Sequence, residues 1–132
     1  MTVVRETTAM IAGMEPVLQP GSFVFVTVSD ATREAQLVPL AKGTFREPEG
    51  LSLILPVEHA PQAEGAIAMR SITLTVHSAL DGVGLTAAVS GALAAEGIAA
   101  NIVAAFHHDH VFVPEHDADR ALAVLQSLQA SA

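Results

Sequence analysis

The sequence predicts a small protein of the α+β class, in which helices pack on one face of antiparallel sheets. Two observations support this prediction. Apolar and polar side chains alternate over residues 72–77, as they do in a strand with one buried face. Apolar side chains recur over residues 85–93 at the spacing of an amphipathic helix. The chain of 132 residues suffices for one compact domain, or for two small halves that share a core.

The composition excludes several classes of function. Because the chain contains no cysteine, it has no disulfides, no thiolate nucleophile and no cysteine zinc site. A formal net charge of −8, with 6 scattered basic residues, disfavours binding to nucleic acid. No apolar run reaches the roughly 18 residues of a membrane span, and the N-terminus lacks the pattern of a signal peptide. We therefore expect a soluble cytoplasmic protein with no nucleic acid and no membrane partner.

The first predicted elements are a helix and a strand. Residues 6–13 carry apolar side chains at helical spacing, and Gly13 suits the left-handed residue that ends many helices. After a turn at Pro20 and Gly21, residues 23–28 form a nearly continuous run of β-branched and aromatic residues. Such a run is typical of a central strand that is covered on both faces.

Two shorter apolar runs follow in the first half. Residues 36–40 and 51–55 predict a pair of strands, because a charged stretch with Gly and Pro, residues 42–50, separates them. A short helix is predicted between residues 56 and 65, with Pro61 inside it as an unfavourable residue.

The second half has a more regular pattern. The strand predicted at residues 72–77 leads into a helix, for which Asp81 is the expected N-cap and Gly97 the expected end. The apolar stripe of this helix consists of Leu85, Ala88, Val89, Ala92 and Leu93.

Two strands and a helix complete the predicted fold. Residues 100–106 and 110–113 predict strands joined by a tight corner, and Asp117 is the expected cap of a final amphipathic helix. The order β-α-β-β-α in the second half, and α-β-β in the first, predicts two related halves of ferredoxin-like type. We place these halves at residues 1–66 and 67–132.

The loop between the strand at 72–77 and the following helix is the first candidate site. A loop with glycines that enters a helix leaves backbone N–H groups unpaired and places the positive end of the helix dipole there. Gly82 and Gly84 allow a ligand to approach the backbone closely, while His77, Ser78 and Asp81 offer polar groups to it. Ordinary helix capping explains the same residues, so the residues alone leave both interpretations open.

A histidine cluster at residues 107–110 is the second candidate site. Three imidazoles and a carboxylate are ligands for zinc or nickel. Because consecutive strand residues point to opposite faces, His108 and His110 are the more suitable pair. The alternative is a polar hairpin corner whose histidines bond internally. In a ferredoxin-like fold this corner lies at the same end of the sheet as His77, so we expect the two to approach each other.

The sequence offers little support for catalysis. Ser78 and Ser90 lack a suitable order of His and Asp partners, and no phosphate-binding loop is present. Glu47 and Glu49 flank Pro48 in an expected turn, where solvated carboxylates are the ordinary interpretation. We therefore assign no catalytic residue, no metal and no cofactor.

Several motifs resemble the ACT domain, a module that binds amino acids and similar small effectors in metabolic enzymes. They are residues 77–88 (HSALDGVGLTAA), residues 93–98 (LAAEGI), and Asn101 with Ile102. With Pro20-Gly21, Glu49-Gly50-Leu51 and residues 108–114 (HDHVFVP), the whole chain resembles a bacterial family of stand-alone proteins with two ACT-like halves.

The resemblance implies a regulatory protein without catalytic activity, which binds an amino acid or a similar metabolite. It implies side-by-side pairing of sheets, and we expect a homodimer. The implied ligand-binding residues are His77, Ser78, Asp81, Gly82, Val83, Gly84, Leu85, Asn101 and Ile102. In this arrangement Asn101 reaches a ligand held by a neighbouring domain. The alternatives are a structural or oligomerisation module with a vestigial pocket, and a metal site at His108 and His110.

Overall fold

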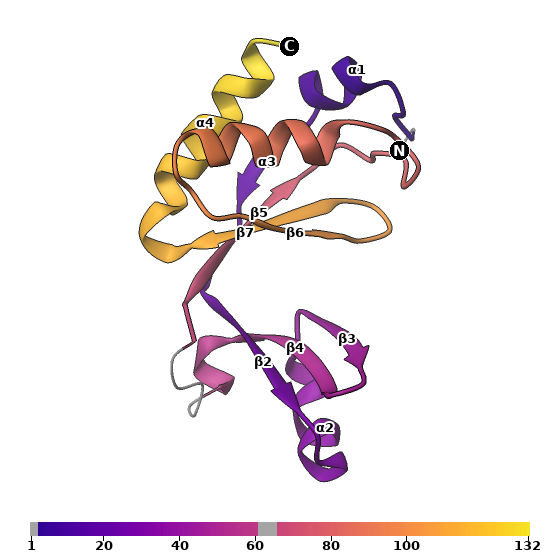
Figure 1. Ribbon diagram of the computed structural model, residues 1–132, viewed down its shortest axis with the longest axis vertical. Coiled ribbons are helices and arrows are strands. Elements are labelled where there is room, and N and C mark those ends of the chain that lie inside the picture. Colours follow the sequence, from indigo (N-terminus) through magenta and orange to yellow (C-terminus); the bar gives the residue numbers. More distant parts are fainter. Residues whose placement is uncertain (1–2, 61–65) are drawn as a thin grey trace. The chain divides into compact units, whose positions relative to one another are not determined.

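The computed structural model describes residues 3–60 and 66–132, which form an α+β protein of two compact units (Figure 1). One unit combines Met1–Pro20 with Arg70–Ala132 and is called here the terminal unit. The other, Gly21–Met69, is called the inserted unit. Among the helices of the described residues, none combines the length and the apolar character that crossing a membrane requires.

The sheet of the terminal unit is built on the predicted strand that begins the second half, β5 (Met69–Leu74). Its neighbours are β1 (Pro16–Leu18), which pairs with it in antiparallel orientation, and β7 (Asp109–Pro114). The strand β6 (Asn101–Ala104) pairs with β7, also antiparallel, so the order is β1-β5-β7-β6. The first strand of this sheet therefore comes from the beginning of the chain.

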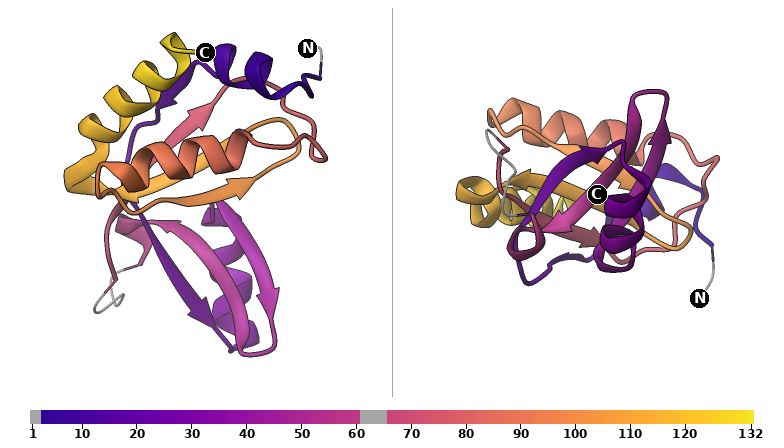
Figure 2. Two further views of the ribbon diagram at one scale, coloured as in Figure 1. Left: turned by 45° about the horizontal axis from the view of Figure 1, so that its top comes forward. Right: turned by 90° about the horizontal axis from the view of Figure 1, so that it is seen from below.

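Three helices cover one side of this sheet, as both views show (Figure 1 and Figure 2, left). They are α1 (Thr7–Ala12), α3 (Leu85–Ala95) and α4 (Ala118–Ala130), the last preceded by the 3-10 turn η3 (Glu115–Asp117). Each leucine fully buried between these layers stabilises the fold by roughly 1.5–3 kcal/mol. The core contains Met10, Met14, Ile72, Leu74, Val76, Leu85, Val89, Leu93, Ile98, Val111, Val113, Ala118, Ala121 and Leu125.

The inserted unit contains a sheet of three antiparallel strands in the order β3-β4-β2. The strands are β2 (Phe23–Val28), β3 (Gly43–Glu47) and β4 (Gly50–Pro56). Between β2 and β3 lie the helix α2 (Ala31–Leu37) and the 3-10 turn η1 (Val38–Leu40). Val28, Leu51, Leu53 and Leu55 form the core of this unit.

The predicted strand at residues 36–40 is wrong, because these residues end α2 and form η1. The Asp30 carboxylate accepts a hydrogen bond from the Thr32 N–H at 3.0 Å and caps α2, a signal that the prediction overlooked. The antiparallel partner of β4 is instead β3, which lies within the charged stretch interpreted as a connection. A strand with a single partner tolerates such polar residues because it is mostly exposed.

Three further predictions, about two helix caps and one helix, also differ from the structure. The N-cap of α3 is Gly84, not Asp81. Asp117 occupies the cap position of α4, but its carboxylate accepts from Arg120 at 3.0 Å instead of from the helix backbone. The predicted helix between residues 56 and 65 is only the 3-10 turn η2 (Val57–His59) in the part that the structure describes, and residues 61–65 lie outside that part.

The order β5-α3-β6-β7-α4 confirms the predicted β-α-β-β-α arrangement of the second half. The strand β1, at Pro16–Leu18, was not predicted. The division of the sequence at residue 66 stays a prediction.

Candidate functional site

The predicted loop between β5 and α3 lies against the N-terminal segment of the chain. The Val4 N–H donates to the His77 carbonyl at 2.8 Å, and the Ala79 N–H donates to the Val4 carbonyl at 2.8 Å. These bonds form a short parallel bridge between Val4 and Ser78. The N-terminal segment thus runs beside the first residues of the loop.

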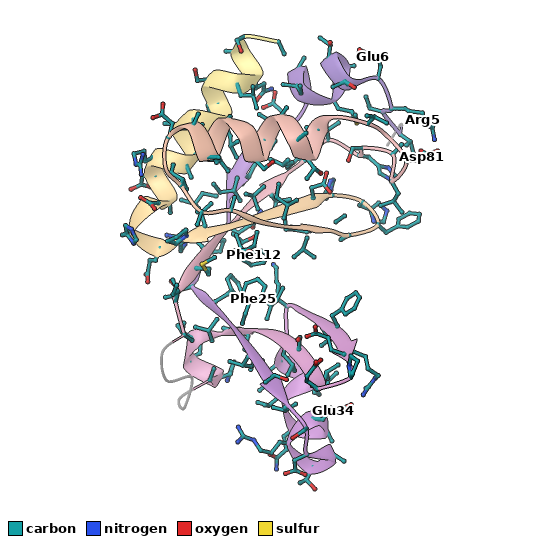
Figure 3. All side chains as sticks on the ribbon, viewed as in Figure 1. Arg5, Glu6, Phe25, Glu34, Asp81 and Phe112 are labelled. Atoms are coloured by element: carbon teal, nitrogen blue, oxygen red, sulfur yellow. The ribbon has the colours of Figure 1, made fainter. Side chains whose placement is uncertain are left out.

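Side chains of the same segment hold the rest of the loop. Arg5 pairs with Asp81 at 3.0 Å, an exposed ion pair at the end of the terminal unit (Figure 3). The Thr7 hydroxyl donates to the Val83 carbonyl. Asp81 therefore contacts the N-terminal segment and does not cap α3.

Glu6 anchors the short helix that follows this segment. Its carboxylate accepts from the Thr8 N–H at 3.0 Å and from the Ala9 N–H at 2.7 Å, and so caps α1 (Figure 3). The hydrogen bonds from Ala9 and Thr8 lower the pKa of the Glu6 carboxyl. The carboxylate of Glu6 is therefore engaged within the N-terminal segment.

A cavity of about 110 Å³ lies at the junction between the loop and α3. All residues that line it belong to the terminal unit. The lining includes four predicted site residues, namely Ser78, Gly82, Gly84 and Leu85. Its other members are Met10, Ala79, Leu80, Thr86, Ala104 and Asp109.

The N-terminus of α3 faces this cavity with free backbone donors. Gly84 has no side chain to cap the helix, and Leu85 and Thr86 line the cavity. In the described residues, the N–H groups of Leu85, Thr86 and Ala87 have no hydrogen-bond acceptor. Free N–H groups at the positive end of a helix dipole are suited to bind an anionic group.

Asp109 contributes a buried carboxylate to the same cavity. Its residue is only 9% exposed, and the Ser78 hydroxyl donates to its Oδ2 at 3.1 Å. No Lys, Arg or His in the structurally described part of the chain forms an ion pair with it. The cavity therefore contains hydrogen-bond donors and an acidic acceptor together.

The histidines of the second candidate site form internal contacts. The ring centroid of His77 lies 5.2 Å from that of His107. This confirms the expectation that the corner between β6 and β7 approaches His77. The Nδ1 of His108 lies 3.3 Å from the Val76 carbonyl, and the Nδ1 of His110 lies 3.0 Å from the Thr73 hydroxyl. Over residues 3–60 and 66–132, no group of three or more His, Asp or Glu is placed to hold a metal ion.

The remaining predicted site residues lie outside the cavity lining. Val83 is exposed. The ring centroid of His77 lies 5.9 Å from that of Phe106. Asn101 is exposed where β6 begins, and Ile102 packs against the core of the terminal unit. Their roles as ligand-binding residues stay predictions.

Six lining residues were not among the predicted ligand-binding residues, namely Met10, Ala79, Leu80, Thr86, Ala104 and Asp109. Met10 and Ala104 are ordinary apolar residues, and nothing in the sequence connects them with the loop. Asp109 was considered only as a member of the histidine cluster. Asp109 is the first residue of β7 and lies two residues before the buried Val111, and this alternation was the sequence signal that its side chain points to the buried face.

Comparisons with known proteins agree with this architecture. A sequence model of the ACT domain matches residues 4–69, and a second model of the ACT domain matches residues 68–127. No curated protein matches the chain. A crystal structure from Vibrio cholerae, of a protein of unknown function described as a possible transport protein, is 43% identical. It aligns with a TM-score of 0.79 over 92% of this chain and 94% of that one.

Two more distant structures show similarity of fold alone. A protein from Agrobacterium tumefaciens is 20% identical, with a TM-score of 0.66 over 86% of this chain and 87% of that one. The ligand-free regulatory subunit of aspartate kinase from Thermus thermophilus is 12% identical. Its TM-score is 0.62, over 86% of this chain and 95% of that one.

Proposed function

The chain belongs to the ACT domain family, and from this membership we propose that it is a non-catalytic regulatory protein that binds an amino acid or a similar small metabolite. A regulatory role through small molecules agrees in general terms with this family and with the fold of the aspartate kinase regulatory subunit. The observation that supports the proposal most is the group of free N–H donors at the start of α3, which faces a cavity.

The physical basis is the binding of a carboxylate by unpaired backbone amides. A carboxylate at a helix N-terminus gains about 0.3–1 kcal/mol from the dipole at an exposed site, and up to about 2 kcal/mol when partly buried. Hydrogen bonds to a charged group add roughly 1.5–3 kcal/mol each. Gly82 and Gly84 are half-buried and line the cavity, and the side on which a Cβ would stand is occupied by Met10 and Thr7.

The size of the cavity limits the ligand. Because a water molecule in the liquid takes about 30 Å³, a cavity of about 110 Å³ corresponds to only a few water molecules. Pockets for drug-sized ligands measure about 300–1,000 Å³. We therefore expect a small amino acid, and not a nucleotide or a large aromatic compound.

A thermal-shift screen of the full chain against the proteinogenic amino acids, nucleotides and divalent metals tests the proposal. A ligand at one hundred times its Kd stabilises the folded state by about 2.7 kcal/mol, which raises the melting temperature by several degrees. A shift with an amino acid supports the proposal. A shift with zinc alone favours the histidines, and no shift with any compound favours a structural or oligomerisation module.

Filling the cavity is the mutational test. Ala104→Leu places a larger side chain at the end of β6, where Ala104 lines the cavity and is otherwise exposed. We expect this variant to lose the melting-temperature shift with the amino acid that stabilises the parent protein, because the ligand no longer fits.

The matched control is Ala105→Leu, the next residue, which is exposed and does not line the cavity. This variant should keep the full shift. Loss of the response in both variants, or in neither, would contradict the placement of the ligand.

A further inference from the structure

The carboxylate of Asp109 is a buried acidic group without a cationic partner in the described part of the chain. At 9% exposure it has lost most of its hydration, and the Ser78 hydroxyl is the only side-chain donor that reaches it there. An aspartate is almost never buried in a protein unless it is paired, because transfer of a charge from water is costly. Among the described residues, Asp109 therefore has no positive partner to offset its burial.

The position of Asp109 indicates where this partner binds. Asp109 and Ser78 line the same cavity as Leu85 and Thr86, whose N–H groups have no acceptor in the described residues. The cavity thus presents an acidic acceptor and a set of amide donors to one ligand. A molecule with an ammonium group and a carboxylate satisfies both.

We infer that Asp109, oriented by Ser78, binds the ammonium group of the ligand and distinguishes an amino acid from the corresponding hydroxy acid. This inference rests on the proposed function, because it concerns the same cavity. The Ser78 hydroxyl donates to Oδ2, so the carboxylate is held in position while its other lone pairs remain able to accept from an ammonium group.

The same carboxylate discriminates against other anions. A phosphate or a second carboxylate placed in the cavity would lie beside a buried negative charge, and like charges in a poorly hydrated site repel strongly. We therefore expect the cavity to reject phosphate esters and dicarboxylic acids, although the α3 N-terminus alone would accept them.

Calorimetry with paired probes tests the inference on the full chain. The probes are glycine, L-alanine and L-serine, with glycolate, L-lactate and L-glycerate as counterparts in which a hydroxyl replaces the ammonium group. We expect at least one amino acid to bind the parent protein about tenfold or more tighter than its counterpart, because a charge-assisted hydrogen bond is lost.

Two variants separate the role of Asp109 from effects on folding. Asp109→Asn keeps the shape and the acceptor for Ser78 but removes the charge, so it should weaken binding of the amino acid about 10- to 100-fold and leave the hydroxy acid unchanged. Ser78→Ala should weaken amino-acid binding less, because the carboxylate remains. Asp119→Asn, at an exposed position in the first turn of α4, is the control and should bind like the parent protein.

The outcomes distinguish this inference from the proposed function. Equal binding of an amino acid and its hydroxy acid, unaffected by Asp109→Asn, would overturn the inference and leave the proposed function intact. If none of these probes, and no amino acid in the screen, binds to the parent protein, the proposed function fails and the inference fails with it.

Discussion

Gly84 occupies a position that requires glycine, both for its backbone conformation and for the space around it. Its φ is +107°, a conformation that side chains rarely adopt. A Cβ added there would also lie 2.7 Å from Cγ2 of Thr7, closer than two carbon atoms can approach. The sequence indicated only that Gly84 would admit a ligand. The structure adds that Gly84 makes room for the N-terminal segment.

Replacement of Gly84 by alanine should therefore destabilise the protein even without ligand. We expect Gly84→Ala to lower the free energy of unfolding by about 1–3 kcal/mol, because it combines a strained backbone with a steric contact. Urea denaturation measures this change.

Gly91→Ala is the matched control for this prediction. Gly91 lies within α3, and a Cβ there would meet nothing within 4 Å. Because alanine favours the helix over glycine, this variant should be more stable than the parent by about 0.5–1 kcal/mol. A Gly84→Ala protein as stable as Gly91→Ala would contradict the proposed strain.

Glu6 makes a contribution to stability that depends on pH. Its pKa is lowered in the folded state by hydrogen bonds from the Ala9 and Thr8 N–H groups. In the unfolded chain the pKa of a glutamate is about 4.3. A lowered folded-state pKa means that the contribution is fully present above the unfolded value. It is lost as the pH falls through the folded value.

Glu6→Gln should consequently differ most from the parent protein near neutral pH. We expect the parent to have the higher melting temperature at about pH 6, and the difference to shrink as the pH falls below about 4. Thermal unfolding followed by circular dichroism across this range measures the difference. Glu58→Gln, at an exposed position in η2, is the control, and a Glu6→Gln difference that is independent of pH would refute the assignment.

At the scale of elements, local patterns predicted the second half well and part of the first half badly. The strand at 23–28 and the helices of the second half have long patterns, and their existence was confirmed. The prediction that this strand is covered on both faces was wrong, because Phe25 and Thr27 are exposed. The apolar run at 36–40 is short, and periodicity does not distinguish a short strand from the end of a helix. The cap at Asp30 would have resolved the ambiguity, since it marks α2 at its beginning.

The strand β6 lies at an edge of the sheet, where a second copy of the chain can pair with it. It pairs with β7 on one side and stands at the end of the strand order. Its other edge has no strand partner among the described residues, which suits pairing with a second copy. This agrees with the homodimer that we propose for the protein. Val103, an exposed apolar residue in the middle of β6, would lie within such an interface.

Val103→Lys should therefore shift the protein toward the monomer, because charged side chains on an edge strand oppose pairing. Light scattering after gel filtration should give twice the chain mass of 13.6 kDa for the parent and the single mass for the variant. Val103→Thr, which keeps a β-branched side chain, is the control and should remain dimeric. A monomeric parent protein at micromolar concentration would contradict the proposal.

At the scale of the whole molecule, the terminal unit is assembled from both ends of the chain. The strand β1 pairs with β5 in the register Pro16 to Leu74, and the helix α1 contributes Met10 to the same core as α3 and α4. The candidate cavity depends on this assembly, because Met10 lines it together with residues of the second half. A site described from residues 77–85 alone is therefore incomplete.

The sequence by itself determined the α+β class, the β-α-β-β-α order of the second half, the family, and the loop at which the cavity lies. These properties follow from periodicity, turn residues and motifs, all of which are local in the chain. Only the tertiary structure decided that the N-terminal segment holds this loop, that Asp81 binds Arg5 instead of capping α3, and that Asp109 shares a cavity with the start of α3. Such contacts join residues that are distant in sequence and that meet only when the whole unit packs together, so no local pattern records them.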